Sequence, residues 1–320
     1  MEDPAVPIVS LAAPEAEAAE VLRLACTEHG FFYLTDHGVS EELVQAAFAA
    51  QRAFFSRTLE EKMRIKANKY YRGYTPFAEE TLDPQRSRHG DSHEGLYYGR
   101  HVEEGSPEAE LPLHGPNQWP DETALPGYRA ATEAYLQAVA ALGCRLLRLL
   151  ALSLGLAADH FSPHFTRPML FLRPLHYSAE RSSEAEGLYA AGAHTDYGML
   201  TFLRTDGQPG LQICTDGAAW RDVPPIPGAF HCNLGDMLAR WTNGRYRSTL
   251  HRVVNRTGRE RYSIAFFFEP NFDAEVAALP QCLEHEQPPL FPPTTAGAHI
   301  LERYNATHAG YGAAATGAAA

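Results

Sequence analysis

Cysteine is scarce in this sequence, and the few cysteines form no recognisable pattern. The five are widely separated, with no CxxC pair among them: Cys26, Cys144, Cys214, Cys232 and Cys282. A disulfide framework or a thiolate zinc site needs paired or clustered cysteines, so both are disfavoured. The scattered set fits reduced thiols in a protein core. We therefore expect a cytoplasmic protein.

Positive charge and long apolar runs are also scarce. The 320 residues include 27 lysines and arginines against 39 acids, which gives a formal net charge of −12. Nucleic acids and membrane surfaces are therefore not expected as partners, because nothing offsets the repulsion from phosphates. The sequence contains no run of about 18 apolar residues, so no membrane-spanning helix is expected. The acidic N-terminal stretch also lacks the order of a signal peptide.

Internal repeats and glycine-rich phosphate loops are absent as well, which disfavours a nucleotide cofactor. What is present is ordinary for a globular protein: 45% apolar and 21% charged residues. The length allows one large domain or two small ones.

Residues 1–125 are predicted to mix helices with short strands. Strands are expected at 6–11 and 31–34, and helices at 14–29 and after Ser40, which suits a helix N-cap. Residues 67–125 are rich in glycine, proline, tyrosine and histidine and show no sustained period. We expect them to be mostly loop, and a loop of this length is often functional.

Residues 126–310 are predicted to begin with the longest helix, over 126–156, and to continue as short strands. The strands are expected at 169–177, 199–203, 211–214, 229–234, 249–254 and 262–268. This spacing favours a sandwich or double-sheet jelly roll over a βαβ fold. We expect a mainly β core with flanking helices (α+β) that forms one compact unit with residues 1–125. The alanine-rich tail, 311–320, has little to bury and is predicted to be flexible.

Two histidines and an aspartate have the spacing of a metal site. His194 and Asp196 alternate along one predicted strand end and can therefore point toward one ion. Antiparallel pairing could bring His251, near the start of another predicted strand, alongside them. Two imidazoles and one carboxylate on one face of an octahedral ion leave open positions, as in Fe(II) oxygenases. The His-x-Asp pair alone is a weak signal.

Arg261 and Ser263 also alternate, on a predicted strand that continues into a buried run. An arginine directed into an apolar barrel needs an anion, because an unpaired buried charge is costly. A ligand carboxylate held by the guanidinium, with Ser263 as a further donor, would meet that need. A structural salt bridge to one of the 39 acids is the alternative.

Taken in order, these motifs resemble those of the 2-oxoglutarate/Fe(II)-dependent dioxygenases of the isopenicillin N synthase-like superfamily. The matching segments are His194-x-Asp196, His251 and Arg261-x-Ser263 for its HxD…H…RxS pattern, and Gly30–Leu34 and His37–Val39 for its N-terminal part. The resemblance covers almost the whole chain. It implies a distorted double-stranded β-helix, the jelly roll, wrapped by N-terminal helices.

The resemblance also implies cofactors and a reaction. Fe(II) would be held by the two histidines and Asp196, and the far carboxylate of 2-oxoglutarate by Arg261 and Ser263. Tyr177 occupies the position where many members place a further tyrosine on that carboxylate, although the usual Tyr-Pro is Tyr-Ser here. With O₂, such an enzyme oxidises an unactivated C–H bond of a small molecule by hydroxylation, desaturation or cyclisation, and releases succinate and CO₂.

The substrate is expected between the barrel mouth and the loop at 67–125, because long loops with aromatic and charged groups often bind ligands. The candidate substrate residues are Tyr71, Arg72, Tyr74, Glu80, Glu94, Arg173, Phe268 and Asn271. The expected partner is a small molecule, and the expected state a monomer, with a weak homodimer as the alternative.

Other functions remain open from the sequence. Some branches of the same superfamily keep the Arg-x-Ser motif but do not use 2-oxoglutarate. A metal-dependent hydrolase or isomerase with Zn²⁺ at the triad is a second alternative, and a non-catalytic ligand-binding protein of the same fold is a third.

Overall fold

The computed structural model describes residues 6–215, 217, 219–283 and 288–307, so the predicted tail, 311–320, lies outside the described residues. The helices are α1 (Glu15–Glu28), α2 (Glu41–Phe55), α3 (Leu59–Met63), α4 (Tyr128–Ser153), α5 (Asp236–Trp241) and α6 (Ala296–Thr307). The strands are β1 (Ile8–Ser10), β2 (Phe31–Thr35), β3 (Gly73–Thr75), β4 (His93–Gly99), β5 (Met169–Tyr177), β6 (Ala191–His194), β7 (Leu200–Thr205), β8 (Leu211–Cys214), β9 (Arg221–Asp222), β10 (Phe230–Leu234), β11 (Leu250–Val253), β12 (Arg261–Glu269), β13 (Glu275–Val276) and β14 (Thr294–Thr295).

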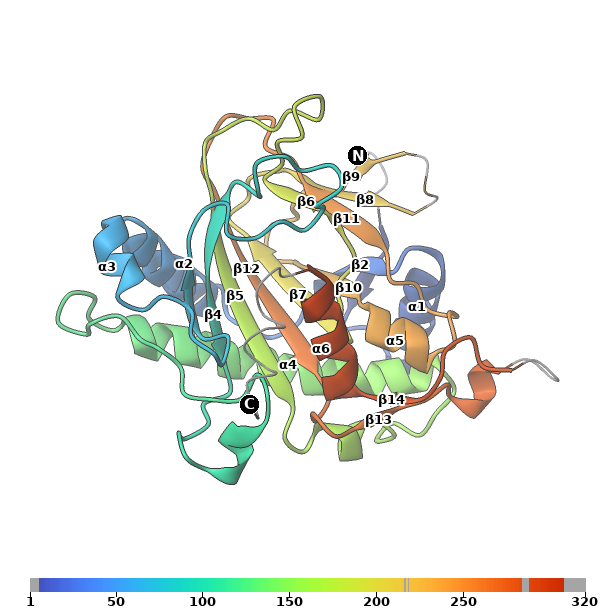
Figure 1. Ribbon diagram of the computed structural model, residues 1–320. Helices are drawn as coiled ribbons and strands as arrows, with labels where there is room; N and C mark the ends of the chain where they lie inside the picture. Colours follow the sequence, from blue (N-terminus) through green and yellow to red (C-terminus); the bar gives the residue numbers. More distant parts are fainter. Residues whose placement is uncertain (1–5, 216, 218, 284–287, 308–320) are drawn as a thin grey trace.

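Two sheets form the core, as the predicted jelly roll requires. The large sheet has the order β1-β2-β10-β7-β12-β5-β4-β3, and the small sheet has the order β6-β11-β8-β9. All these neighbours pair antiparallel except β1 and β2. Strands from residues 1–125 extend the large sheet at both edges, so the N-terminal region shares one sheet with the rest (Figure 1).

The two faces of the large sheet bury different things, because side chains alternate along each strand. On one face Phe266, Phe268 and Leu172 join the main apolar core beneath α1, α2 and α4. α4 comes close enough that a Cβ on Gly143 would lie 2.9 Å from the Phe268 ring. The opposite face carries Phe171 and Phe267 toward the interior of the barrel. Figure 1 shows α4 running behind the large sheet and α6 crossing in front of it.

Most predicted elements are confirmed. Each of the six strands predicted after residue 165 is present, within about two residues at either end. The hydroxyl of Ser40 accepts a hydrogen bond from the Leu43 N–H at 3.2 Å, so Ser40 caps α2 as predicted. The segment 67–125 differs, because it contributes β3 and β4 to the large sheet. β4 is buried on both faces and therefore lacks the alternation that marks a half-exposed strand.

α4 is the long helix that was predicted over 126–156, and it is rich in apolar residues. Of the described helices, it alone is long and apolar enough to cross a membrane by length and composition, and 56% of that window is buried inside the protein. Leu142, Leu146 and Leu150 are among its buried residues, and they belong to the main core. α4 therefore packs as the central helix of a globular fold does.

Candidate active site

His194, Asp196 and His251 converge at the end of the small sheet. His194 ends β6 and lies directly opposite His251 on β11, as antiparallel pairing predicted. The Asp196 Oδ1 atom lies 3.7 Å from the Nε2 atom of each histidine. One ligand atom from each residue lies within 4.8 Å of the others, so the three can hold one metal ion.

The remaining polar atoms of these side chains are held by the protein, which fixes their orientation. The Nδ1 atoms of His194 and His251 donate to the carbonyl oxygens of Gly192 (2.8 Å) and Thr249 (3.1 Å), so each Nε2 is available as a ligand. Thr201 and Asn233 both donate to Asp196 Oδ2, at 2.5 and 2.7 Å, which leaves Oδ1 available. The three free atoms face one another.

Burial and charge favour the protonation states that a metal needs. Burial lowers the pKa of His251, and the neighbouring His194 lowers it further, so the imidazole is neutral. Burial alone would raise the pKa of Asp196. His251, His194 and the hydrogen bonds from Thr201 and Asn233 outweigh that effect and hold the pKa below its usual value. A neutral imidazole and an ionised carboxylate are the forms that bind metals.

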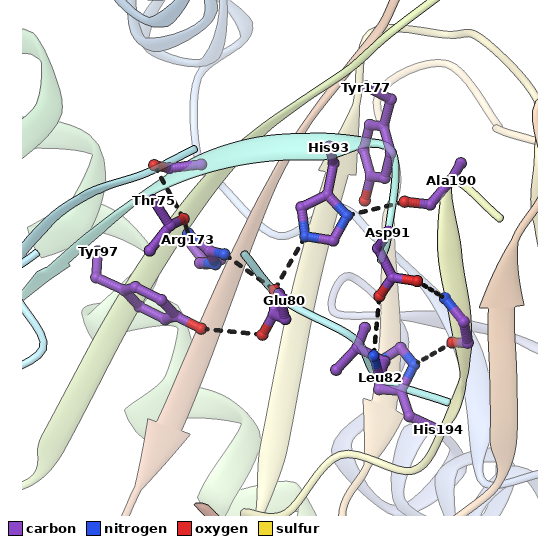
Figure 2. Close-up of polar contacts among 12 residues, drawn as sticks. Thr75, Glu80, Leu82, Asp91, His93, Tyr97, Arg173, Tyr177, Ala190 and His194 are labelled. Carbon is purple, nitrogen blue, oxygen red and sulfur yellow. Dashed lines mark hydrogen bonds and ion pairs between the residues drawn. The ribbon is translucent and has the colours of Figure 1, made fainter. Parts of the chain in front are cut away.

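Asp91, which was not among the predicted site residues, braces the strand that carries His194. Its Oδ1 and Oδ2 atoms accept the N–H groups of Gly192 and Leu82, each at 3.0 Å (Figure 2). Burial raises the pKa of this carboxyl to about 6. The contact with Gly192 ties the loop before β4 to the residue whose carbonyl orients His194.

Arg261 begins β12 and is buried beside the ring of Tyr177. The side chain is 3% exposed, and its Nε and Nη1 atoms have no hydrogen-bond partner within the described residues. The guanidinium carbon lies 4.7 Å from the centre of the Tyr177 ring, and Ser263 Oγ lies 3.4 Å from the Tyr177 hydroxyl. No carboxylate of the described chain forms a salt bridge with Arg261, so the predicted alternative of a structural pair does not apply.

A cavity of about 130 Å³ lies beside the triad and Tyr177, and Arg261 and Ser263 contact Tyr177 from outside its lining. Apolar and aromatic side chains form most of its wall, among them Leu82, Phe171, Leu175, Tyr197, Phe267, Ile300 and Tyr304. The metal-binding triad and Tyr177 also line it. Ile300 and Tyr304 come from α6, so the C-terminal helix completes the wall.

One side of the cavity carries a group of charged residues centred on Glu80. Its carboxylate accepts hydrogen bonds from Arg173 Nη2 at 3.0 Å and His93 Nε2 at 2.9 Å, and the Tyr97 hydroxyl donates to it at 3.5 Å (Figure 2). His93 Nδ1 donates to the Ala190 carbonyl, so both ring nitrogens carry protons. Burial alone would lower the pKa of His93, but Glu80 raises it above its usual value.

A second acid, Glu269, lines the cavity at the end of β12. It is 2% exposed, and its Oε2 atom accepts the Met199 N–H at 2.5 Å. Burial raises its pKa to about 8, and nearby Asp196 adds to the rise while the Met199 hydrogen bond opposes it. No salt bridge links Glu269 to a cation in the part of the chain that the structure describes.

Family models match both parts of the chain. Residues 6–122 match the N-terminal model of non-haem dioxygenases in morphine synthesis, and residues 166–270 match the 2OG-Fe(II) oxygenase superfamily. The chain belongs to the 2OG-Fe(II) oxygenases. It is therefore an oxidoreductase that uses Fe(II), 2-oxoglutarate and O₂, and the hydrolase, isomerase and ligand-binding alternatives are set aside.

The similarity to known proteins extends over almost the whole length of the oxygenase. Azadirone synthase of Melia azedarach is 36% identical, with 90% of this chain and 88% of that protein covered. Homoarginine-6-hydroxylase of Arabidopsis thaliana is 34% identical, with 90% and 86% covered. A full-length Neurospora crassa protein, crystallised with alpha-KG and thymine, is 27% identical; the match covers 96% of this chain and 98% of that one, with a TM-score of 0.84.

The oxygenase brings only part of the predicted substrate set to the cavity. Glu80 and Arg173 line it. The other six candidates lie elsewhere: Tyr71, Arg72, Tyr74, Glu94, Phe268 and Asn271. Glu94 and Phe268 sit on the helix-covered face of the large sheet, one residue out of phase with the cavity face.

The contacts of the remaining four are structural. Tyr74 donates a hydrogen bond to Glu94 on the helix-covered face, and Arg72 donates to the backbone carbonyls of Tyr70, Tyr71 and Leu113. Asn271 accepts the Arg167 N–H and donates to Thr166. The ring of Tyr71 packs 4.9 Å from that of Tyr304, outside the cavity wall. These residues have packing and structural contacts outside the cavity, and their contact with a substrate stays a prediction.

Several cavity residues were missed from the sequence, and some of them had a signal. Arg261 and Ser263 define one face of β12, and continuing that alternation leads to Ala265, Phe267 and Glu269. The same rule applied to β5 from Tyr177 leads to Phe171. The contribution of α6 had no such signal, because it depends on how the C-terminal helix packs across the barrel.

Proposed function

We propose that the oxygenase oxidises one C–H bond of a compact, largely apolar molecule that lies in the cavity between Phe171, Phe267 and the metal-binding triad. The observation that carries this proposal is that the triad lines the same cavity as the aromatic side chains of Phe171, Phe267 and Tyr197. Aromatic and aliphatic walls bind apolar molecules and keep bulk water from the reacting bond. Hydroxylation, desaturation or ring closure would each be an outcome of such an oxidation.

The triad supplies the iron ligands in this proposal. His194 Nε2, Asp196 Oδ1 and His251 Nε2 would hold Fe(II), since each is free of protein hydrogen bonds and turned toward the other two. Iron and 2-oxoglutarate, when bound, supply the O₂ chemistry that converts 2-oxoglutarate into succinate and CO₂. Thr201 and Asn233 would hold the Asp196 carboxylate in place.

Arg261, Ser263 and Tyr177 form the site for the far carboxylate of 2-oxoglutarate. A buried guanidinium with two unpartnered nitrogens is costly unless an anion completes it, and a carboxylate matches its planar donors. The hydroxyls of Ser263 and Tyr177, 3.4 Å apart, offer further donors beside it. The donor set therefore fits the co-substrate that the family uses.

Glu80 and Arg173 would contribute to the substrate wall. Arg173 stacks 3.8 Å from the centre of the Tyr97 ring, and Thr75 and Glu80 accept its hydrogen bonds. Because these groups satisfy one another, they would shape the cavity and set its polarity. The similar Neurospora crassa structure contains thymine together with alpha-KG, which supports a compact substrate.

Replacing His251 with alanine tests the metal role. We expect Fe(II) affinity to fall by more than about 100-fold, because one of three protein ligands is removed, and 2-oxoglutarate-dependent O₂ uptake to be lost. Iron content after dialysis and oxygen-electrode measurements would record both. His101→Ala is the matched control, since His101 is exposed and outside the cavity. Iron retained at one per chain in His251→Ala would rule out the assigned role.

A further inference from the structure

Glu269 ends a row of alternate residues on one face of β12. Arg261, Ser263, Ala265 and Phe267 precede it on that face, and Ala265, Phe267 and Glu269 line the cavity. Phe267 pairs with Thr201, whose hydroxyl holds the Asp196 carboxylate, so Phe267 marks the level of the triad. Glu269 follows two residues later, on the side of the triad opposite to Arg261. Its carboxyl can therefore contact a molecule bound beyond the iron but cannot take part in holding 2-oxoglutarate.

The carboxyl of Glu269 is left with unused hydrogen-bonding capacity. Its Oε2 atom accepts one backbone N–H, from Met199, and no side chain of the described protein donates to its Oε1 atom. No cation of the described residues pairs with it. A buried carboxyl without a counter-charge is costly, and stability alone would favour an apolar residue there. Such a group on a cavity wall points to a ligand.

The position of the Glu269 carboxyl depends on the absence of a side chain at Gly198. A Cβ at Gly198 would overlap both carboxyl oxygens of Glu269, at a separation that no side chain allows. The glycine therefore leaves the space that the carboxyl occupies. Both residues line the cavity.

The charges around the cavity make its two ends different. At one end Arg173 and the doubly protonated His93 surround the carboxylate of Glu80, and the carboxyl of Asp91 also lies near His93. Arg173 is level with Ala265, which lies four residues, or about 13 Å, along the strand from Glu269. The acids at the Glu80 end therefore already have cations of the protein beside them, whereas no cation of the described residues pairs with Glu269.

The walls between the two ends also suit a cation. Phe171, Phe267, Tyr197 and Tyr304 line the cavity, and aromatic faces attract ammonium groups, most strongly when water is excluded. The net charge of −12 also raises the local concentration of cations.

We infer that Glu269 forms an ion pair with a protonated amine of the substrate, so that the oxygenase acts on a compact amine. This inference rests on the proposed function, because it names the substrate class of the same cavity. Glu269 is then a specificity-determining residue: it selects the amine and directs a neighbouring C–H bond toward the metal.

Binding to the anaerobic enzyme loaded with Fe(II) and 2-oxoglutarate tests this inference. The probes are matched sets that differ in one group: benzylamine, benzyl alcohol and benzoate, and cyclohexylamine with cyclohexanol. Calorimetry should show the amines binding at least about ten-fold more tightly than the alcohols, and the benzoate binding weakest. Equal affinities for amines and alcohols, or no amine binding up to about 10 mM, would overturn the inference.

Two variants should remove the preference by different routes. Glu269→Gln removes the charge, and Gly198→Ala displaces the carboxyl without changing it. In both we expect the ratio of alcohol to amine dissociation constants to fall to within about two-fold of unity. Glu260→Gln, on the exposed surface, should keep the wild-type ratio. A preference for amines over alcohols that persists in both Glu269→Gln and Gly198→Ala would contradict the inference.

Iron content and 2-oxoglutarate affinity, measured on the same wild-type preparation, separate this inference from the proposed function. If iron and 2-oxoglutarate bind normally but the amines bind no more tightly than the alcohols, only the inferred substrate class is contradicted. Iron that fails to bind the triad would contradict the proposed function, whatever the amines do.

Discussion

Two groups of buried polar residues lie on opposite faces of the large sheet around β4 and β5, and they differ in whether the protein pairs their charges. On the helix-covered face, Glu94 accepts hydrogen bonds from Lys62 at 2.6 Å, Tyr74 at 2.5 Å and His176 at 2.8 Å. On the opposite face, two nitrogens of Arg261 have no hydrogen-bond partner within the described residues. We call the first group, with its four residues, the Glu94 cluster.

A single step along each strand separates the two groups. Arg261 pairs with Tyr177, which pairs with His93, while the next residues along these strands place His176 beside Glu94. Because alternate residues face opposite sides of a sheet, one step moves a side chain from the helix-covered face to the cavity. In the Glu94 cluster the charges are paired within the protein, although His176 Nε2 has no hydrogen-bond partner among the described residues. Around Arg261, which we call the open group, no carboxylate of the described residues pairs with the guanidinium, and a ligand carboxylate would complete it.

Breaking the Glu94 cluster should have the largest effect. Glu94→Gln leaves the Lys62 ammonium buried without its carboxylate, which should lower the free energy of unfolding by about 3–5 kcal/mol. Chemical denaturation of the metal-free protein would measure it. Glu260→Gln is the matched control, because Glu260 also lies near His176 (3.7 Å) but is 60% exposed. A loss below about 1 kcal/mol in Glu94→Gln would show that the cluster does not stabilise the fold.

For Arg261, in the open group, we expect a loss of ligand binding without a loss of stability. Arg261→Gln removes a charge with no carboxylate partner, so the free energy of unfolding should not fall, while binding of 2-oxoglutarate should weaken by about 2–5 kcal/mol. Anaerobic calorimetry with 2-oxoglutarate and denaturation of the same variant would give both numbers. Arg259→Gln, two residues earlier and exposed, should change neither. Unchanged 2-oxoglutarate affinity in Arg261→Gln would remove the co-substrate role.

The contrast also explains which features could be predicted from the sequence. The strands and the triad depend on local patterns: the alternation of His194 with Asp196, and runs of β-rich residues between turn signals. Which residues meet the substrate depends on the register between strands distant in sequence. Phe268 was chosen where Phe267 lines the cavity, and Glu94 where His93 does. A one-residue shift reverses every side chain of a strand, and no local pattern fixes it.

Two buried glutamates, Glu94 and Glu269, extend the same contrast to pH. Burial alone would raise the pKa of Glu94, but its three hydrogen-bond donors hold it below its usual value. Burial raises the pKa of Glu269 to about 8, since only one backbone N–H opposes the effect. A carboxyl with a lowered pKa in the folded state adds stability above its unfolded value of 4.5, and that stability is lost as the pH falls through the folded pKa. A carboxyl such as Glu269, whose pKa is raised in the folded state, adds stability below its unfolded value of 4.5, and that stability is lost as the pH rises toward 8.

Glutamine variants of these two residues should therefore respond to pH in opposite directions. In metal-free protein, the stability advantage of wild type over Glu94→Gln should shrink as the pH drops below 4.5. Wild type should lose stability relative to Glu269→Gln as the pH rises from 4.5 to 8, because the folded carboxyl resists ionisation. Urea denaturation across this range would measure both differences. If both stability differences between wild type and variant change in the same direction with pH, the folded protein does not shift the pKa values of Glu94 and Glu269 in opposite directions.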